Sequence, residues 1–226
     1  TGIGMQNIKN MMEQMKGEFE IINNGIDIIK YSFVIGQRAS LRAKMSLSDN
    51  DTLIGHVGYF LALKNQSFLV DVFSELLKRD NNYHLVLIGD GALRQEIEKK
   101  VDGLGLKHKV TFTGNINNVS DYLNAIDLIV MPSLFEGLPL TLVEQQANGL
   151  QCIVSDTITK EADKTGNLRF ISLNAPVSEW VQAIENCNCK QGRELGSKKA
   201  VDDIAKAGYS IQTEAKKLVD FYKSIC

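Results

Sequence analysis

The chain has 226 residues, enough for one large or two small domains with a sizeable core. Its 25 basic and 27 acidic residues leave a formal net charge of −2, which excludes the basic field that attracts nucleic acid or an anionic membrane. No apolar run approaches the ~20 residues of a membrane-spanning helix, and no secretory signal opens the chain. Four cysteines in a chain of this size need no disulfides, so we expect a reducing, cytoplasmic setting.

Residues 1–50 are expected to form short and irregular elements. Apolar residues at helical spacing predict a helix at 5–16, and a short strand at 19–22 precedes an Asn-Asn-Gly turn. A second short helix is expected at 38–47, followed by a polar loop. This part of the chain has the character of a linker.

A regular alternation of strands and helices begins near residue 51. The expected strands are 53–57, 83–88, 110–113, 126–131, 152–155 and 168–172. The expected helices are 66–78, 92–101, 119–125, one with Pro139 in its first turn, 177–186, 193–206 and 212–225. Such alternation is typical of a parallel sheet covered on both faces. We therefore predict an α/β fold, a Rossmann-like doubly wound parallel sheet with helices on both faces.

The stretch 132–150 combines the end of a buried strand, a glycine loop and the start of a helix. Free backbone N–H groups and the positive end of the helix dipole point the same way there, which makes an anion site. Glu136 and Glu144 flank this site, so the stretch suggests a sugar bound next to a phosphate. Lys64 precedes another helix, where it either neutralises that phosphate or remains a solvated loop lysine.

Glycines fall at or just after the ends of the first four strands of this alternation, an edge where open α/β sheets bind ligands. They are Gly58, Gly89, Gly91, Gly114 and Gly137. The turn at 89–91 lacks the full GxGxxG pattern, and neither a GxxxxGK[ST] loop nor a GxSxG elbow occurs. The three histidines lack metal-ligand spacing, so we expect no metal and no cofactor.

Six short motifs follow one another in register along the chain. They are INNGID at 22–27, Gly58 with Lys64 and Asn65, IGDG at 88–91, FTG at 112–114, FEG at 135–137, and Glu144. Together they resemble the C-terminal, donor-binding half of the retaining, nucleotide-sugar-dependent glycosyltransferases of group 1, which have the two-domain GT-B fold. The resemblance covers roughly residues 20–225. Glu136 and Glu144 stand where that family has two glutamates separated by seven residues.

The resemblance implies roles for particular residues. Glu136 would contact hydroxyls of the donor sugar, and the backbone N–H groups of Gly137 and Leu138 would approach the sugar and the diphosphate. Lys64 would pair with the diphosphate and stabilise the leaving group as its charge develops. Glu144 would accept hydrogen bonds from the ribose hydroxyls. The implied nucleotide-binding residues are Gly58, Gly89, Gly114, Asn115 and Ile116 (the last two against the base) and Glu144.

The chain departs from the family pattern in two respects. Many members carry arginine directly after the glycine equivalent to Gly58, whereas this chain has Tyr59. The family's N-terminal domain, with its acceptor site, is missing, so no catalytic residue is predicted. We assign 1–50 to an interdomain linker region with a remnant of that domain, and 51–226 to the nucleotide-sugar-binding domain with its C-terminal helices. Partly exposed apolar residues are expected on the last helix at Ala215, Leu218, Val219 and Tyr222.

The function implied is that of the donor-binding domain of a bacterial hexosyltransferase in polysaccharide biosynthesis. The whole enzyme would transfer a sugar, with retention, from a nucleotide diphosphate sugar to a saccharide or lipid-linked acceptor, in the cytoplasm or peripherally at the inner face of the membrane. This part alone would bind the nucleotide sugar without turnover, because the acceptor stays unpositioned. One alternative is a non-catalytic regulatory or partner subunit with a degenerate site, for which Tyr59 argues. The other is a non-hydrolysing nucleotide-sugar epimerase, which would lack the paired glutamates in this register.

Overall fold

A six-stranded parallel sheet forms the centre of the protein. The computed structural model describes residues 22–189 and 192–225, so the helix predicted at 5–16 and most of the strand predicted at 19–22 lie outside the described residues. The strands are β1 (Thr52–Val57), β2 (Tyr83–Ile88), β3 (Val110–Gly114), β4 (Leu128–Met131), β5 (Gln151–Ser155) and β6 (Leu168–Ile171). Their order is β3-β2-β1-β4-β5-β6, and every neighbouring pair is parallel. The predicted fold class is confirmed.

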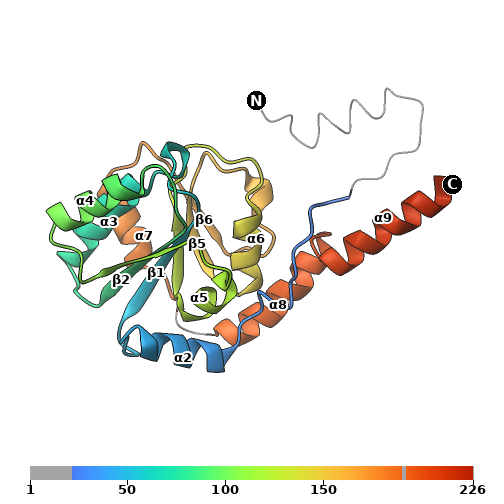
Figure 1. The fold of residues 1–226 in the computed structure, drawn as a ribbon, viewed down its shortest axis with the longest axis horizontal. Coiled ribbons are helices and arrows are strands. Elements are labelled where there is room, and N and C mark those ends of the chain that lie inside the picture. The colour runs from blue at the N-terminus through green and yellow to red at the C-terminus, as the bar shows by residue number, and fades with distance from the viewer. Residues whose placement is uncertain (1–21, 190–191, 226) are drawn as a thin grey trace.

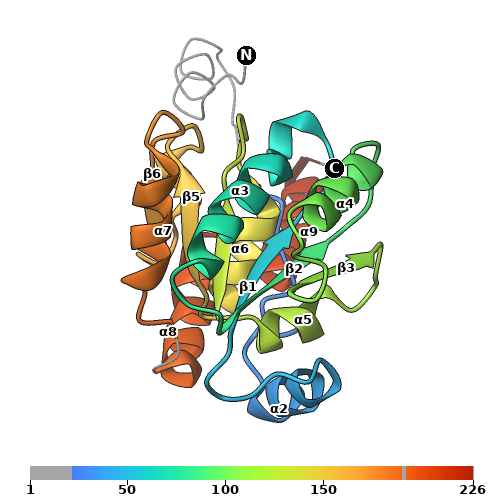
Figure 2. The same cartoon turned by 90° about the vertical axis from the view of Figure 1, so that its left-hand side faces the viewer.

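Helices cover both faces of the sheet (Figures 1 and 2). The helices are α2 (Ile35–Lys44), α3 (Gln66–Leu77), α4 (Arg94–Gly103), α5 (Val119–Ala125), α6 (Leu140–Ala147), α7 (Val177–Glu185), α8 (Arg193–Lys206) and α9 (Ile211–Ile225), with short 3-10 helices η1 (Ala62–Lys64) and η2 (Lys160–Ala162). One buried cluster packs α3, α4 and α7 against the first face of the sheet. A second packs α2, α5 and α6 against the other. The four inner strands β1, β2, β4 and β5 are therefore buried on both faces over most of their length, which explains their largely apolar sequences, whereas the edge strands β3 and β6 include exposed residues.

The strand order changes direction at β1, which pairs with β2 on one side and with β4 on the other. The ladder between β1 and β4 comprises only two residue pairs, Ile54 with Leu128 and Gly55 with Ile129. Gly55 is needed there, because a Cβ atom would lie 2.3 Å from Cδ1 of Ile126. Loops that leave the carboxyl ends of strands on either side of such a switch point diverge and form a ligand-binding crevice.

Asp127 is buried and fixes α2 beneath the sheet. Its carboxylate accepts hydrogen bonds from Arg38 (2.5 Å), from Arg42 (2.9 Å) and from a backbone N–H of β1 (2.8 Å). The prediction that a strand begins at residue 126 is therefore wrong by two residues. Ile126 is the C-cap of α5, and the side chain of Asp127 accepts hydrogen bonds from two arginines of α2. Strand β4 therefore begins at residue 128.

Two helices, α2 and α4, begin two or three residues away from their predicted starts. Helix α2 starts at Ile35 and ends at Lys44, instead of spanning 38–47, because Asn124 holds the backbone N–H of Val34 (2.8 Å) at its start. Helix α4 starts at Arg94 instead of 92, because the preceding residues form a turn in which the Arg94 N–H bonds the carbonyl of Gly91.

Helix α9 extends away from the body of the protein, as Figure 1 shows. Its base is held by Glu214, which is buried and accepts hydrogen bonds from the Asn23 backbone (3.2 Å) and Lys217 (2.6 Å). The predicted exposure of its apolar residues is confirmed, with Leu218, Val219 and Tyr222 exposed by 39%, 50% and 57% and Ala215 also exposed. Within the described residues, no helix has both the length and the apolar character that crossing a membrane requires.

Candidate functional site

A cavity of about 270 Å³ lies at the carboxyl edge of the sheet, where β1, β2 and β3 end and α6 begins. Its lining residues are Val57, Gly58, Tyr59, Lys64, Ile88, Gly89, Gly114, Asn115, Ile116, Val119 and Thr141. Six residues predicted to bind the donor are thus brought together: Gly58, Lys64, Gly89, Gly114, Asn115 and Ile116. Their individual roles stay predictions.

The glycine turns after β1, β2 and β3 pack directly against one another and form the floor of this cavity. The N–H of Gly58 donates to the carbonyl of Ile88 (3.0 Å), and the N–H of Gly89 donates to the carbonyl of Gly114 (3.1 Å). Gly89 has a φ of +134°, and a Cβ atom on it would lie 2.2 Å from the carbonyl oxygen of Gly58. Only glycine fits this position, since both the backbone conformation and the contact exclude a side chain.

Lys64 and Glu136 form an ion pair beside the cavity. Lys64 Nζ lies 2.5 Å from Glu136 Oε1, and the Ser133 hydroxyl donates to the same oxygen (3.0 Å). The loops that carry this pair are tied together, because the side chain of Asn65 donates to the carbonyl of Pro132 (3.1 Å). The two residues predicted to hold the sugar and the diphosphate therefore hold each other in this structure.

His56 lies beneath this ion pair and is fully buried in β1. Its Nδ1 lies 3.0 Å from the Val130 carbonyl, to which it donates, and its Nε2 has no partner. A Cβ atom on Gly58 would lie 3.6 Å from this Nε2 and 3.3 Å from the Lys64 side chain, so the three residues are neighbours. Burial lowers the pKa of His56 to about 4, and the ring is neutral at physiological pH. At the level of sequence, His56 is one of three histidines without metal-ligand spacing, and nothing there connects it with the site.

Helix α6 presents its N-terminus to the site. The helix begins at Leu140, and Pro139 precedes it as the N-cap instead of lying in the first turn as predicted. No side chain caps this end, so first-turn N–H groups are available to an anion. Gly137 and Leu138 lie in the loop just before it, and the space around Gly137 is open. Thr141, which the sequence did not single out, adds a buried hydroxyl without a partner to the cavity wall.

Glu144 follows Thr141 by one helical turn and so belongs to the same side of α6. It is partly buried and does not line the cavity itself. Burial raises the pKa of Glu144, while the nearby phenol of Tyr31 and the charge of Lys30 act in the opposite direction. The proximity of Tyr31 to Glu144 was missed at the level of sequence, because the two residues belong to segments far apart in the chain and no local pattern connects them.

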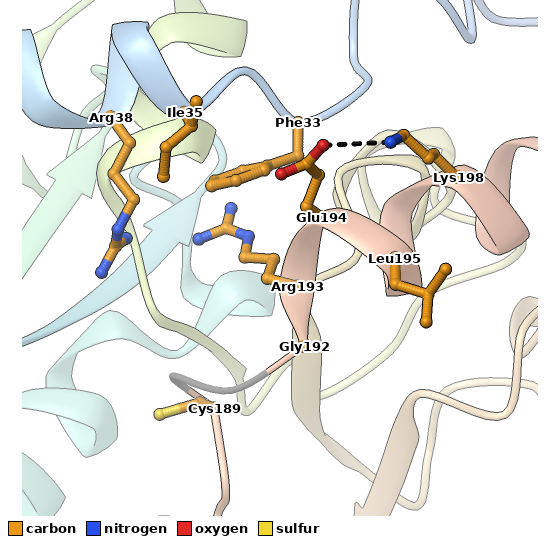
Figure 3. A pocket seen from close by; sticks show the side chains of 9 residues that line it. All are labelled: Phe33, Ile35, Arg38, Cys189, Gly192, Arg193, Glu194, Leu195 and Lys198. Atoms are coloured by element: carbon orange, nitrogen blue, oxygen red, sulfur yellow. Dashed lines mark hydrogen bonds and ion pairs between the residues drawn. The ribbon is translucent and has the colours of Figure 1, made fainter.

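A larger cavity of about 470 Å³ lies between α2 and the start of α8 (Figure 3). Its most buried charge is Arg193, whose guanidinium lies 4.7 Å from the centre of the Phe33 ring. That guanidinium donates to carbonyl oxygens at the ends of α5 and α6, and Lys198 pairs with Glu194 at the rim. Burial lowers the pKa of Arg193 to about 9. These charges are already partnered within the protein.

Comparison with known proteins agrees with this architecture. The sequence profile of the family described as "Glycosyl transferases group 1" matches residues 37–164. The chain belongs to this family of glycosyltransferases.

Individual relatives are also named as glycosyltransferases. The chain is 35% identical over 206 residues to the "Putative glycosyltransferase EpsF" of Bacillus subtilis, a match that covers 89% of this chain and 52% of the relative. It is 26% identical over 214 residues to a "UDP-Gal:alpha-D-GlcNAc-diphosphoundecaprenol alpha-1,3-galactosyltransferase" of Escherichia coli, covering 91% of this chain and 54% of the relative. The chain thus spans about half the length of these curated relatives.

Solved structures share the fold. Anabaena Alr3699/HepE in complex with UDP superposes with a TM-score of 0.76 at 19% identity, covering 97% of this chain and 62% of that one. A sucrose-phosphate synthase from Thermosynechococcus elongatus also reaches 0.76, at 20% identity, and covers 96% of this chain and 56% of that one. At this level of identity the likeness establishes the arrangement of the sheet and helices.

Proposed function

We propose that this chain is the donor-binding half of a retaining group 1 glycosyltransferase and that it binds a nucleoside diphosphate sugar at the carboxyl edge of the sheet. The observation that carries the proposal is the cavity that unites three glycine turns, Lys64 and the start of α6. UDP is the favoured nucleotide, since the Anabaena structures contain UDP or UDP-glucose and the Escherichia coli relative is named for UDP-Gal. The coverage of about half of each relative supports a place as one half of a longer enzyme, and we propose that it is the C-terminal half.

The proposed chemistry depends on an exchange of partners. A bound diphosphate offers Lys64 a stronger negative charge than the carboxylate of Glu136 does, and the N-terminus of α6 adds its dipole. Lys64 then stabilises the charge that develops on the leaving diphosphate. Glu136, released from the ion pair, accepts hydrogen bonds from hydroxyls of the donor sugar. No metal and no cofactor is needed in this scheme.

The activity of the whole enzyme goes beyond this chain. We propose transfer of a hexose with retention to a saccharide or lipid-linked acceptor, in polysaccharide biosynthesis. A further domain positions that acceptor. This chain alone therefore binds the nucleotide sugar without turnover, because the acceptor is not positioned and the diphosphate leaving group is exposed to water. We propose that the whole enzyme works in the cytoplasm or peripherally at the inner face of the membrane.

Calorimetry with UDP, GDP and ADP tests the donor site. UDP should bind, a chelator should not change its affinity, and Lys64→Gln should weaken binding at least tenfold through the loss of one charge-assisted contact. Lys78→Gln, which removes an exposed lysine of a surface ion pair, is the matched control and should bind UDP like the unmodified chain. Absence of binding by all three nucleotides at millimolar concentration would show the proposal to be wrong.

A non-catalytic partner subunit is the second candidate. Tyr59 favours it, since this residue lies at the cavity where the family resemblance leads one to expect arginine. Glu144→Ala in the full-length protein separates the two candidates. An enzyme should lose transfer activity steeply, whereas a partner subunit should keep its function with at most modest destabilisation.

A further inference from the structure

His56 lies where β1 and β4 separate at the switch point of the sheet. The ladder between these two strands ends at the pair of Gly55 and Ile129. One residue further along β4, the carbonyl of Val130 lies 3.0 Å from Nδ1 of the fully buried His56 ring. Because a carbonyl oxygen only accepts, the hydrogen of the neutral ring is on Nδ1 and the lone pair is on Nε2.

The Nε2 atom of His56 is a buried acceptor that has no partner among the described residues. Buried polar atoms of side chains are nearly always hydrogen-bonded, so an unpaired one calls for an explanation. Burial holds the pKa of His56 at about 4, and the atom therefore remains an acceptor at physiological pH. An acceptor kept open in this way points to a donor that reaches it in another state of the site.

Lys64 carries a donor beside this acceptor. A Cβ atom on Gly58 would lie 3.6 Å from Nε2 of His56 and 3.3 Å from both Cδ and Cε of Lys64, so the ring and the lysine stem border the same small space. Gly58 has no side chain and leaves this space open. The ammonium group has three donors, and its bond to Glu136 (2.5 Å) uses one of them. Rotation of the flexible stem gives the others access to the space above Gly58.

We propose that His56 is a positioning residue for Lys64, and that its Nε2 accepts a hydrogen bond from Nζ of Lys64 once the donor diphosphate has displaced Glu136. The inference rests on the proposed function and deepens it, because it names the group that holds the ammonium ion after the ion pair has opened. A second fixed contact restricts a flexible lysine to one place beside the diphosphate, so less freedom is lost on binding. The neutral ring suits this role, because a protonated ring would repel the ammonium group.

Calorimetry with UDP on two substitutions of His56 separates positioning from a structural role. An asparagine amide can replace Nδ1 as the donor to Val130 but does not extend to the place of Nε2, whereas the longer glutamine can put an amide oxygen there. His56→Asn should therefore weaken UDP binding about tenfold, the effect of one lost hydrogen bond to a charged group. His56→Gln should stay within about threefold of the unmodified chain. A structural role through the bond to Val130 predicts the opposite order of the two variants.

The dependence on Lys64 gives a second measurement. In a Lys64→Gln background, His56→Asn should change UDP affinity less than about twofold, because the two residues act through one contact. A full tenfold loss in that background would show that His56 acts elsewhere. His108→Asn, at an exposed position, is the matched control and should bind UDP like the unmodified chain.

A ¹⁵N NMR measurement on the histidine rings needs no substitution of His56. The Nε2 resonance should move upfield when UDP is added to the unmodified chain, because the atom gains a donor, and it should stay in place for Lys64→Gln.

Three outcomes would overturn the inference while leaving the proposed function intact. They are UDP binding by His56→Asn that equals that of the unmodified chain, weaker binding by His56→Gln than by His56→Asn, and an Nε2 resonance that stays in place on saturation of the unmodified chain with UDP. If the unmodified chain binds GDP or ADP instead, the same measurements are made with that nucleotide. Absence of binding by all three nucleotides would instead defeat the proposed function, and the inference with it.

Discussion

At the scale of single residues, His56 beside the candidate site makes the stability of the fold depend on pH. Its pKa of about 4 in the folded protein lies below the ordinary value near 6.5, because a buried ring resists protonation. As the pH falls from 6.5 to 4, this histidine takes up a proton in the unfolded chain but not in the folded protein. The stability that the neutral His56 contributes is therefore lost in that window and is present above it. These two values correspond to a loss of about 2 kcal/mol in the free energy of unfolding between pH 7 and pH 5.

Urea unfolding at pH 7 and pH 5 measures this loss. Between pH 7 and pH 5, the free energy of unfolding of His56→Gln should fall by about 2 kcal/mol less than that of the unmodified chain, because the titrating ring is gone. His108→Gln, at an exposed position, should keep the full dependence. Equal slopes for the unmodified chain and His56→Gln would mean that His56 is not kept neutral by the fold.

At the scale of elements, the floor of the cavity depends on how closely the glycine turns approach one another. Gly89→Ala would put a Cβ atom 2.2 Å from the backbone of Gly58 in a conformation that only glycine adopts readily. Because backbone must move, we expect a loss of more than ~2 kcal/mol in the free energy of unfolding together with loss of UDP binding. Gly103→Ala, in α4 with open space around it, should be neutral or stabilising by up to ~1 kcal/mol. An unchanged urea midpoint for Gly89→Ala would contradict this account of the floor.

The sequence could predict most elements, because apolar runs and glycines mark them locally. The strand at 83–88 and the helices at 119–125 and 193–206 have the predicted bounds. Some errors occur where distant residues decide an element's end, as the arginines of α2 do by binding Asp127 just before β4. The same distinction holds at the site. The glycines follow from the rule that ligands bind at the carboxyl ends of strands, and Lys64 follows from its place just before a helix. The proximity of Tyr31 to Glu144, in contrast, arises only from the tertiary packing.

At the scale of the whole molecule, α9 projects from the body of the protein (Figure 1). It exposes a stripe formed by Leu218, Val219 and Tyr222. Exposed apolar surface of this kind on a helix favours burial against another surface. The match to about half of each relative supports the proposal that the rest of the enzyme supplies that surface.

In this chain alone, we expect the stripe on α9 to cause reversible self-association that increases with concentration. Leu218→Glu should weaken it, because a carboxylate opposes burial of the stripe. The thermal unfolding temperature of the monomer should change little, since the side chain supports no part of the core. Thr213→Glu adds the same charge at another exposed position of α9 and should preserve the association. Sedimentation over a range of concentrations measures the effect. A chain that stays monomeric throughout, or equal association of the two variants, would show that the stripe is not the contact surface.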